Sequence, residues 1–327
     1  MEKIKVGVIG VGNMGKKHVQ AYAALKHLCQ LVGVYDIRQG VSQEVARGFG
    51  IKSFTSLEEL LQEIDAVNIA TPTTTHARIA LKALDNGLHV LLEKPITGLV
   101  EEAQRLLEVA KKRDLILQVG HIERFNPAIR ALPEVLEDEE IIALDVRRMG
   151  PYPPQISDTD VIQDLMIHDI DVVSSLANST IEKISAFARR VKSEKHMDYA
   201  VANLIMEDGI IATLTASRAS QKKVRKMAIT THSSYIELDF LQQKVVVTHK
   251  GLIQDKGEYQ QELEQEDALV EDRDPLKTQL THFINSIEDH VQPLITGADG
   301  LEALKLTRLI QKQVYQQSYI QQEITSS

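Results

Sequence analysis

Hydrophobic and polar positions follow two different rhythms along the chain, and the change comes near Gly120. Before that residue, short apolar runs alternate with segments whose apolar residues recur at helical spacing. The strands predicted from these runs are Lys5–Ile9, Gln30–Tyr35, Ala66–Ala70, His89–Leu92 and Ile116–Val119. The helices predicted between them are Gly15–Ala24, Gln43–Gly48, Ser56–Glu63, His76–Asn86 and Val100–Arg113. Because such alternation produces parallel strands with right-handed crossovers, residues 1–120 are expected to form an α/β domain with a doubly wound parallel sheet.

After Gly120 the predicted strands follow one another with few helices between them. They are Ile141–Met149, Ile181–Arg190, Ala200–Met206, Ile210–Ser217, Val224–Thr231, Tyr235–Asp239 and Lys244–Thr248. Turn-like sequences such as MEDGI and HSSY separate several of them, which favours antiparallel pairing. Residues 121–327 are therefore expected to form an α+β domain with a large, mostly antiparallel open sheet.

Several of these strands are apolar on both faces, as in NLIMEDGIIATLTA. One face can pack on the helices of its own domain, and a second subunit is the commonest cover for the other. The sequence therefore predicts a homodimer or homotetramer formed through this sheet. The acidic and polar segment from Gln254 to Asp274 is predicted to be a mobile excursion from the sheet with solvated charges.

An unusual amount of charge lies within the aliphatic stretch from Asp158 to Leu176. At helical spacing the polar residues form one stripe, made of Asp160, Asp164, His168, Asp171 and Ser175. Two interpretations fit this stripe: the solvated face of an amphipathic helix, or a pair, Asp164 and His168, that points into a cleft. Asp169 lies on the apolar face instead, so it is predicted to be a buried acceptor for backbone N–H groups or for an arginine.

Length and composition restrict the class of protein. A chain of 327 residues exceeds one typical core and indicates two domains. The net charge of −9 argues against a general nucleic-acid binder, because phosphate contacts require a basic surface. The single cysteine, Cys29, can form no internal disulfide and supports no metal cluster alone. The amino terminus enters a predicted strand at once, and no apolar run approaches the ~20 residues that span a bilayer, so a cytoplasmic protein without a membrane partner is expected.

A glycine motif follows the first predicted strand. Gly10, Gly12 and Gly15 have the spacing G-x-G-x-x-G, in which the glycines permit a tight turn, a close approach to a pyrophosphate and close helix packing. Asn13 and Met14 complete the loop that would hold this anion at a helix N-terminus. Asp36 ends the second strand about 20 residues later, where a carboxylate accepts hydrogen bonds from the ribose hydroxyls and repels a 2′-phosphate. The motif predicts NAD binding in a Rossmann domain.

Three further features belong to the same predicted cofactor site. Arg38 can lie over the adenine or turn toward a 2′-phosphate, so NADP is not excluded. The sequence ATPTTTHA follows a predicted strand, and its loop is expected to cap a helix and to contact the cofactor through Thr71, Pro72, Thr73 and His76. Glu93 and Lys94 end the next strand, at the carboxyl edge where a dinucleotide binds. Taken alone, Lys94 would be an ordinary surface lysine.

The segments GVIGVGNMG, ATPTTTHA, EKP and DLMIHDID together resemble the glucose–fructose oxidoreductase / inositol dehydrogenase (Gfo/Idh/MocA) family across nearly the whole chain. The resemblance implies an NAD(P)-dependent dehydrogenase that oxidises a sugar or cyclitol alcohol, or catalyses the reverse reduction. It also implies that Lys94, Asp164 and His168 are the catalytic groups and that the Lys94–Pro95 peptide bond is cis.

The residue types suit this chemistry. His168 can take the hydroxyl proton near neutral pH, and Lys94 can stabilise the developing alkoxide. Asp164, one helical turn before His168, can orient the imidazole or the substrate. A desolvated Lys94 can equally serve as the base, and the sequence leaves the two assignments open.

The sequence also suggests a substrate class. His121, Arg124 and Asn126 in GHIERFNP are candidate substrate contacts, with Arg124 suited to a phosphate or alternatively to a structural tie. Tyr152 is a candidate wall of the site. Within the family, GHIERFNPAI and DLMIHDID are most similar to the branch that acts on nucleotide sugars, the UDP-N-acetylglucosamine 3-dehydrogenases. Free sugars or cyclitols are the alternative substrates. A non-catalytic dinucleotide-binding regulator and a metal site at Asp164, His168 and Asp171 are further alternatives, and the glycine motif makes a metal unnecessary.

Overall fold

The computed structural model describes residues 2–152, 159–255 and 258–325. The chain forms two compact units, Met1–Phe125 with Arg273–Leu304 and Asn126–Asp272 with Lys305–Ser327. The sequence-based boundary after Gly120 lies close to the end of the first segment. However, the pattern assigned Arg273–Leu304 to the second domain, whereas this segment belongs to the first unit.

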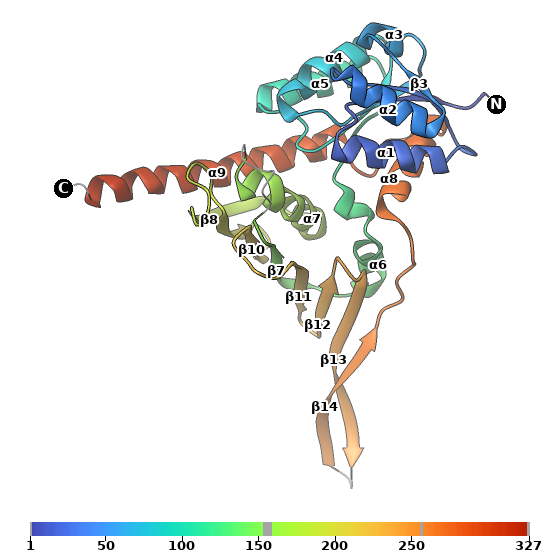
Figure 1. Cartoon of the computed structure of the whole chain (residues 1–327). Helices are drawn as coiled ribbons and strands as arrows, with labels where there is room; N and C mark the ends of the chain where they lie inside the picture. The colour runs from blue at the N-terminus through green and yellow to red at the C-terminus, as the bar shows by residue number, and fades with distance from the viewer. Residues whose placement is uncertain (1, 153–158, 256–257, 326–327) are drawn as a thin grey trace. The chain divides into compact units, whose positions relative to one another are not determined.

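The first unit, which begins at the N-terminus drawn in blue in Figure 1, contains a six-stranded parallel sheet. Its strands, in sheet order, are β3 (Lys52–Ser53), β2 (Gln30–Tyr35), β1 (Lys5–Ile9), β4 (Ala66–Ile69), β5 (His89–Leu92) and β6 (Leu117–Val119). The doubly wound order reverses between β1 and β4, which is the position where such sheets bind dinucleotides. The predicted fold of this unit is therefore confirmed, with the short β3 as an addition.

Helices cover both faces of this sheet. They are α1 (Asn13–Ala24), α2 (Gln39–Phe49), α3 (Leu57–Leu61), α4 (His76–Asp85), α5 (Val100–Lys112) and α8 (Pro275–Glu288), with 3₁₀ turns η1 (Thr73–Thr75) and η2 (Ile122–Phe125). Because both faces are covered, β4 and β5 are almost continuously apolar and buried.

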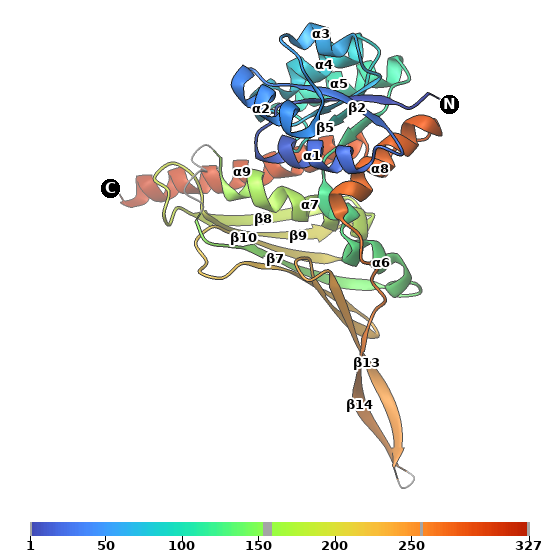
Figure 2. The ribbon, with the colours of Figure 1, turned by 45° about the vertical axis from the view of Figure 1, so that its right-hand side comes forward.

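The segment Arg273–Leu304 completes this unit. On α8, Leu280, Phe283 and Ile284 are fully buried against the apolar residues of β1 and α1. Figure 2 shows α1 and α8 side by side. Further along, the carbonyl oxygen of Ile295 accepts a hydrogen bond from Val119 N–H at the edge strand β6 (3.3 Å). A helix that follows the large sheet in sequence thus covers the first sheet in space.

The second unit contains an eight-stranded sheet in which only β7 and β10 pair in parallel among the described strands. In sheet order the strands are β14 (Glu258–Asp267), β13 (Lys244–Asp255), β12 (Ser234–Asp239), β11 (Val224–Thr231), β7 (Ile141–Met149), β10 (Ile211–Ser217), β9 (Tyr199–Met206) and β8 (Ile181–Arg189). The predicted large, mostly antiparallel sheet is confirmed.

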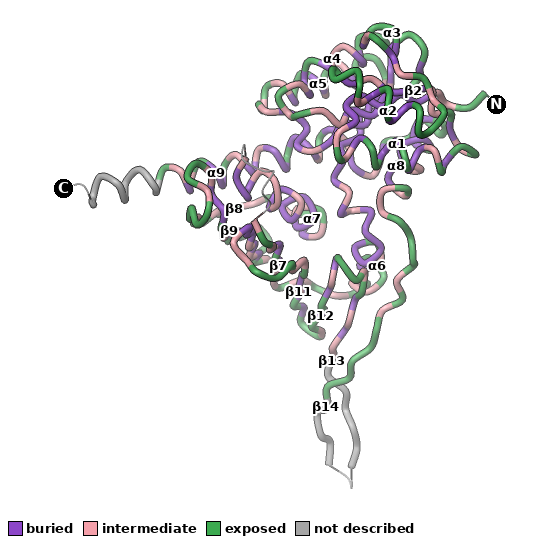
Figure 3. The backbone as a smooth tube through the Cα atoms, viewed as in Figure 1, coloured by how far each residue is buried: buried purple, intermediate pink, exposed green. Residues whose placement is uncertain are grey.

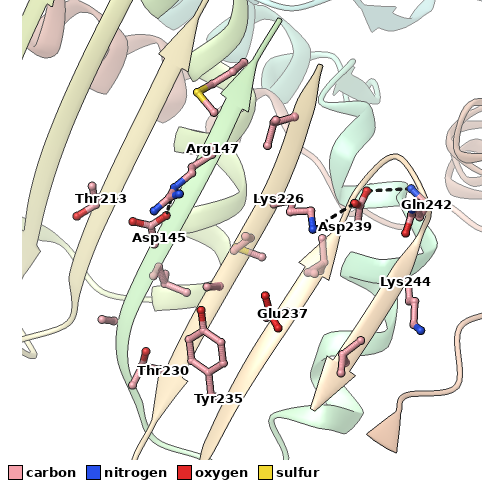
Figure 4. Close-up of a pocket in the computed structure, with 18 of the residues that line it drawn as sticks. Asp145, Arg147, Thr213, Lys226, Thr230, Tyr235, Glu237, Asp239, Gln242 and Lys244 are labelled. Atoms are coloured by element: carbon pink, nitrogen blue, oxygen red, sulfur yellow. Dashed lines mark hydrogen bonds and ion pairs between the residues drawn. The ribbon is translucent and has the colours of Figure 1, made fainter. Parts of the chain in front are cut away.

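One face of this sheet is packed and the other is open. Buried residues alternate with more exposed ones along β7 and β9. The buried apolar set packs on α6 (Pro127–Val135), η3 (Ile162–Met166), α7 (Ile167–Ala177) and the second part of α9 (Gly297–Thr325). Figure 3 shows that most of α7 is buried. The open face carries Asp145, Arg147, Lys226 and Tyr235 (Figure 4).

The hairpin of β13 and β14 corrects one prediction. The acidic segment that begins at Gln254 was expected to be a mobile excursion, but β14 pairs in register with β13 from Val246↔Asp267 to Asp255↔Glu258. Lys244 pairs with Asp267 across the strands (2.8 Å), and His249 lies 3.4 Å from Glu264. An edge strand needs a partner on only one side and can keep its charges in solvent, so its polar composition hid it from the pattern.

Candidate active site

The glycine loop has the geometry that the motif requires. Gly10 has φ +82°, in the left-handed region, and a Cβ there would lie 2.8 Å from the Ala70 carbonyl oxygen. A Cβ at Gly15 would overlap the carbonyl oxygen of Gly10, so the start of α1 packs directly on the turn. A Cβ at Gly12 would meet open space. The side of the loop at Gly12 is therefore the side that a pyrophosphate can approach.

The N-terminus of α1 suits an anion. Gly12 is the N-cap, so no side chain bonds the first-turn N–H groups of Asn13 and Met14. Asn13 is exposed and Met14 half-buried, as expected for residues beside a bound group. These N–H groups and the helix dipole together favour a phosphate at this end.

Asp36 is buried at the end of β2 and accepts hydrogen bonds on both carboxylate oxygens. Val11 N–H donates to Oδ2 (2.9 Å), and Arg38 donates from its backbone N–H (2.9 Å), Nε (3.1 Å) and Nη2 (3.3 Å). Burial opposes the charged form, but the hydrogen bonds from Arg38 and Val11 outweigh it, and the pKa of Asp36 lies below its usual value. A carboxylate has about four acceptor sites, so a ribose hydroxyl must displace donors of the Arg38 side chain.

The loop after β4 is held by its own polar groups. Thr75 Oγ1 lies 2.8 Å from both Thr71 Oγ1 and the Pro72 carbonyl oxygen, while Thr73 is half-buried. The buried ring of His76 lies within hydrogen-bond distance of two carbonyl oxygens, those of Pro95 (Nδ1, 2.9 Å) and Thr71 (Nε2, 2.8 Å), and the neutral ring donates to one of them. Burial lowers the pKa of His76, against the effect of these carbonyl groups. His76 therefore ties the loop at Thr71 to the loop that carries Lys94.

The loop after β5 holds Glu93, Lys94 and Pro95, and the Lys94–Pro95 bond is cis, which confirms that prediction. Glu93 is buried and bonds His18 Nε2 of α1 (2.8 Å), and it accepts the backbone N–H of Lys94 (3.3 Å). Burial opposes its charge, but His18 and Lys94 lower its pKa below the usual value. A Cβ at Gly120 would lie 3.1 Å from this carboxyl group. The backbone N–H of Lys94 is thus held by a buried carboxylate that is itself hydrogen-bonded to His18.

The predicted substrate contacts have structural partners. His121 is fully buried, and burial with the nearby charges of Lys94 and Arg124 lowers its pKa to about 3. Arg124 Nη1 pairs with Asp299 (3.1 Å), as in the structural interpretation of this arginine. Asn126 Oδ1 caps α6 through Ala128 N–H (3.1 Å), and its amide donates to the Phe240 carbonyl oxygen (3.0 Å). Their role in substrate binding stays a prediction, as does that of the half-buried Tyr152.

The polar stripe in the second unit is buried at two of its five residues, Asp160 and Asp171. Asp160 Oδ1 accepts the N–H groups of Ile162 (3.1 Å) and Gln163 (2.9 Å), and its Oδ2 bonds Gln311 Nε2 (2.8 Å). Asp160 and Asp171 are each only 4% exposed. The interpretation as a solvated face is therefore wrong for these two residues.

Asp164 and His168 are both half-buried. Asp164 belongs to a π-helical turn, η3, and His168 to the α-helix that follows, α7. Such turns within helices are frequent at functional sites. Asp164 pairs with Arg218, whose Nη2 lies 2.6 Å from Oδ2.

Asp169 is fully buried and pairs with Arg148 of β7 through Nε (2.8 Å) and Nη2 (2.7 Å). The prediction of a buried acceptor for an arginine is confirmed. The guanidinium also lies over the Phe240 ring, 5.3 Å from its centroid. Among the described residues, no group of three His, Cys, Asp or Glu side chains could hold a metal ion.

Protein-family models match both units of the chain. A model described as an oxidoreductase family with an NAD-binding Rossmann fold matches residues 4–121, and a Gfo/Idh/MocA C-terminal domain model matches residues 148–236. The chain belongs to the Gfo/Idh/MocA family. It is therefore an oxidoreductase whose first unit is an NAD-binding Rossmann fold.

Individual Gfo/Idh/MocA relatives cover almost the whole chain. A UDP-N-acetylglucosamine 3-dehydrogenase of Acidithiobacillus ferrooxidans is 36% identical over 93% of this chain and 95% of its own. A solved structure of that enzyme covers 96% of this chain and 98% of its own, with 34% identity and a TM-score of 0.88. A scyllo-inositol 2-dehydrogenase (NAD(+)) of Bacillus subtilis is 27% identical over 91% of this chain and 90% of its own.

The Gfo/Idh/MocA motifs are distributed over both units. Lys94 belongs to the first unit, and Asp164 and His168 belong to the second. The sequence analysis missed two polar partners in these motifs, His18, which bonds Glu93, and Arg218, which pairs with Asp164. His18 repeats the helical spacing of the buried residues of α1, which is a weak signal, whereas nothing in the local pattern singles out Arg218.

Within the described residues, no helix is both long and apolar enough to cross a membrane.

Proposed function

We propose that this oxidoreductase transfers a hydride from a secondary alcohol of a nucleotide sugar to NAD, with UDP-N-acetylglucosamine or a close analogue oxidised at C3. The observation that carries the proposal is the 36% identity, over 93% of this chain, to an enzyme named UDP-N-acetylglucosamine 3-dehydrogenase. The open glycine loop at the N-terminus of α1, the buried Asp36 and the Lys94 loop support NAD as the acceptor. Bound NAD would supply the hydride acceptor at C4 of its nicotinamide.

Lys94 is the proposed electrostatic catalyst. An ammonium group near the reacting hydroxyl stabilises the alkoxide as the proton leaves, and it holds the hydroxyl in line for transfer. The loop that carries Lys94 is fixed by the Glu93–His18 bond and by the bond from His76 to Pro95. A fixed loop is what such a role requires, because a displacement of about 1 Å can cost a hundredfold in rate.

His168 is the proposed proton acceptor, and Asp164 orients the imidazole or the substrate. They lie one helical turn apart, on η3 and α7. Histidine titrates near neutral pH and so suits a general base. The exchange of duties with a desolvated Lys94 remains the alternative within this proposal. Either assignment requires that Lys94 and the Asp164–His168 pair act on the same bound alcohol.

The test is turnover. Purified protein is incubated with NAD and a panel of UDP-sugars, and the absorbance of the reduced cofactor is followed. UDP-N-acetylglucosamine is expected to be oxidised, and Lys94→Ala is expected to lower kcat about 10²- to 10⁴-fold while NAD binding persists. Lys111→Ala, an exposed lysine on α5, is the matched control and should keep the wild-type rate. Oxidation of free inositol or glucose, with no turnover of any UDP-sugar, would reject the proposed substrate.

A free sugar or cyclitol is the second candidate substrate. The observation that favours it is the similarity to a scyllo-inositol 2-dehydrogenase (NAD(+)), which also extends over 91% of the chain, although at only 27% identity. The same panel therefore includes inositols, and the ratio of kcat/KM values between the two classes decides between them.

We also propose that a second copy of the chain covers the open face of the large sheet. Exposed apolar side chains lie on this face, and Ile205 is the direct cross-strand partner of Ile211. Phe187, on β8, is 59% exposed beside Val201 of β9. Toward β13 the face carries both signs of charge, at Asp145, Arg147, Lys226, Glu237, Asp239 and Lys244 (Figure 4). A face with both signs can pair with itself about a two-fold axis.

A further inference from the structure

Arg218 follows directly after β10, and its side chain is only 3% exposed. Its guanidinium makes two short contacts with the segment that carries Asp164. Nη2 donates to Asp164 Oδ2 (2.6 Å), and Nη1 donates to the carbonyl oxygen of Thr159 (2.7 Å). A planar guanidinium can hold two acceptors at a fixed angle, which a lysine cannot do. Arg218 therefore joins the start of the turn at Thr159 to the carboxylate within it.

The backbone of Arg218 is itself fixed. Its N–H donates to the carbonyl oxygen of Asp198 (2.7 Å). The buried side chain of Asp198 accepts three backbone N–H groups on Oδ2, from Val191 (3.0 Å), Lys192 (2.7 Å) and Ser193 (2.6 Å). Burial opposes the charge of Asp198, but these bonds and the charge of Arg218 lower its pKa. The backbone of Arg218 is thus held at its bond to Asp198, and its side chain contacts the π-helical turn η3 through Asp164.

The turn that carries Asp164, η3, is less regular than the helix that follows it. The N–H of Asp164 bonds the Asp160 carbonyl oxygen (3.2 Å), and η3 is π-helical before α7 takes the regular α form. A π turn departs from regular α geometry, so the direction of Asp164 is not set by α-helical geometry. The carboxylate is 24% exposed, so one side of it is in contact with Arg218 and another can reach solvent or substrate.

We propose that Arg218 is the positioning residue for Asp164, which it holds in one direction and in the ionised form. The inference rests on the proposed function, because it gives Asp164 a part in the reaction. In this arrangement the guanidinium compensates the carboxylate charge, so Asp164 orients a donor and does not take up the substrate proton. That duty falls to His168 or Lys94.

A double-mutant cycle in kcat tests this dependence. Arg218→Met is expected to lower kcat about 10- to 100-fold, through misplacement of Asp164. In the Asp164→Asn background the same substitution should change kcat by less than about threefold, because the residue on which it acts is already lost. Arg218→Lys should recover only part of the rate, because it keeps the charge and loses the second contact. Equal effects of Arg218→Met in the two backgrounds would overturn the proposal.

The pH profile is the second readout. Asp160, His168 and Asp171 lie on the same helical stripe as Asp164, and Arg218 and Asp198 face it from the sheet. Arg218 stays positively charged at every working pH, so it compensates the Asp164 carboxylate throughout the profile. Without it, Asp164 should take up a proton at higher pH, so kcat/KM of Arg218→Met should fall on the acid side at a pH where the wild type is still active. An unchanged profile would contradict the proposal.

Arg148→Lys is the matched control, because Arg148 is a buried arginine of the same unit that pairs with the neighbouring Asp169. It should lower the melting temperature, keep the acid limb of the wild type, and have the same effect on kcat with or without Asp164. If Arg218→Met does not fold, Arg218→Lys serves in the same cycle. Asp164→Asn at the full wild-type rate would overturn the catalytic proposal itself. If Asp164→Asn lowers kcat, but Arg218→Met lowers kcat by the same factor with and without Asp164, only the positioning role would be overturned.

Discussion

Buried polar side chains surround the backbone of Lys94 in the first unit. Glu93 bonds His18, and His76 bonds the Pro95 carbonyl oxygen. These partners are far apart in sequence: His18 and Glu93 are separated by 75 positions. The sequence could place Lys94 at the carboxyl edge of a strand, since strand order follows from the alternating pattern. It could not reveal His18 as a partner, because a single sequence carries no distances between remote residues.

His121 should make the stability of the protein depend on pH. Its folded-state pKa is about 3, below the ordinary value of 6.5, so the unfolded chain binds its proton more readily. This residue therefore lowers stability as the pH falls from about 6.5 toward 3, by at most about 1.4 kcal/mol per pH unit. In urea unfolding measured at pH 7 and pH 5, His121→Asn should show a smaller loss than the wild type. His27→Asn, which replaces an exposed histidine, should behave like the wild type. Parallel losses in all three proteins would contradict the assignment.

Asp36 and Arg38 should affect cofactor choice in opposite directions. Asp36→Asn removes the charge that repels a 2′-phosphate, so NADP should bind more tightly relative to NAD. Arg38→Gln removes a cation that can meet that phosphate and also frees the carboxylate acceptors for the ribose, so the preference for NAD should rise. In each variant the ratio of the dissociation constants for NADP and NAD should change about tenfold. This corresponds to a change of roughly 1.4 kcal/mol in relative binding free energy. Fluorescence titration of the reduced cofactors measures both ratios, and a change of both in the same direction would refute this account.

At the scale of the elements, the pattern of apolar and polar residues predicted strand bounds correctly where clear turn sequences flanked an apolar run. β1, β2, β5, β7 and β11 run as predicted, residue for residue. β14 was missed because it is polar and pairs only with β13. The helix α7 shows the intermediate case: its apolar face was placed correctly, and the buried Asp169 followed from that phase. The preceding π turn at η3 has no signature in a period of 3.6 residues, so it was not predicted.

The bond between Asp169 and Arg148 should contribute strongly to stability, because it joins α7 to β7 in the interior. Asp169→Ala leaves a buried guanidinium without its carboxylate and is expected to lower the free energy of unfolding by about 3–5 kcal/mol. Asp145→Ala is the matched control on the open face of the same strand, where its partner Arg147 is 59% exposed. That change should cost no more than about 1 kcal/mol. Equal losses in denaturant unfolding would show that burial of the Asp169 pair does not matter.

At the scale of the whole molecule, the open sheet face is expected to determine the oligomeric state. Ile211→Lys places a charge beside Ile205 and should dissociate the proposed dimer or tetramer by desolvation and repulsion. Glu207→Lys, on an exposed residue outside the strands, is the control and should keep the wild-type mass. Light scattering after gel filtration gives the mass of each protein. A monomeric wild type would refute the proposed interface.

The first unit is assembled from two stretches that are separated by the whole of residues 126–272. During synthesis the ribosome produces the nucleotide-binding strands first, yet Leu280, Phe283 and Ile284, which cover one face of them, emerge only after the large sheet has been made. Residues 1–125 expressed alone would expose that face and are expected to aggregate. During translation, residues 1–125 therefore lack α8 until the large sheet has been synthesised. We expect the nascent chain to need chaperones until then, because an apolar face of the first unit stays exposed.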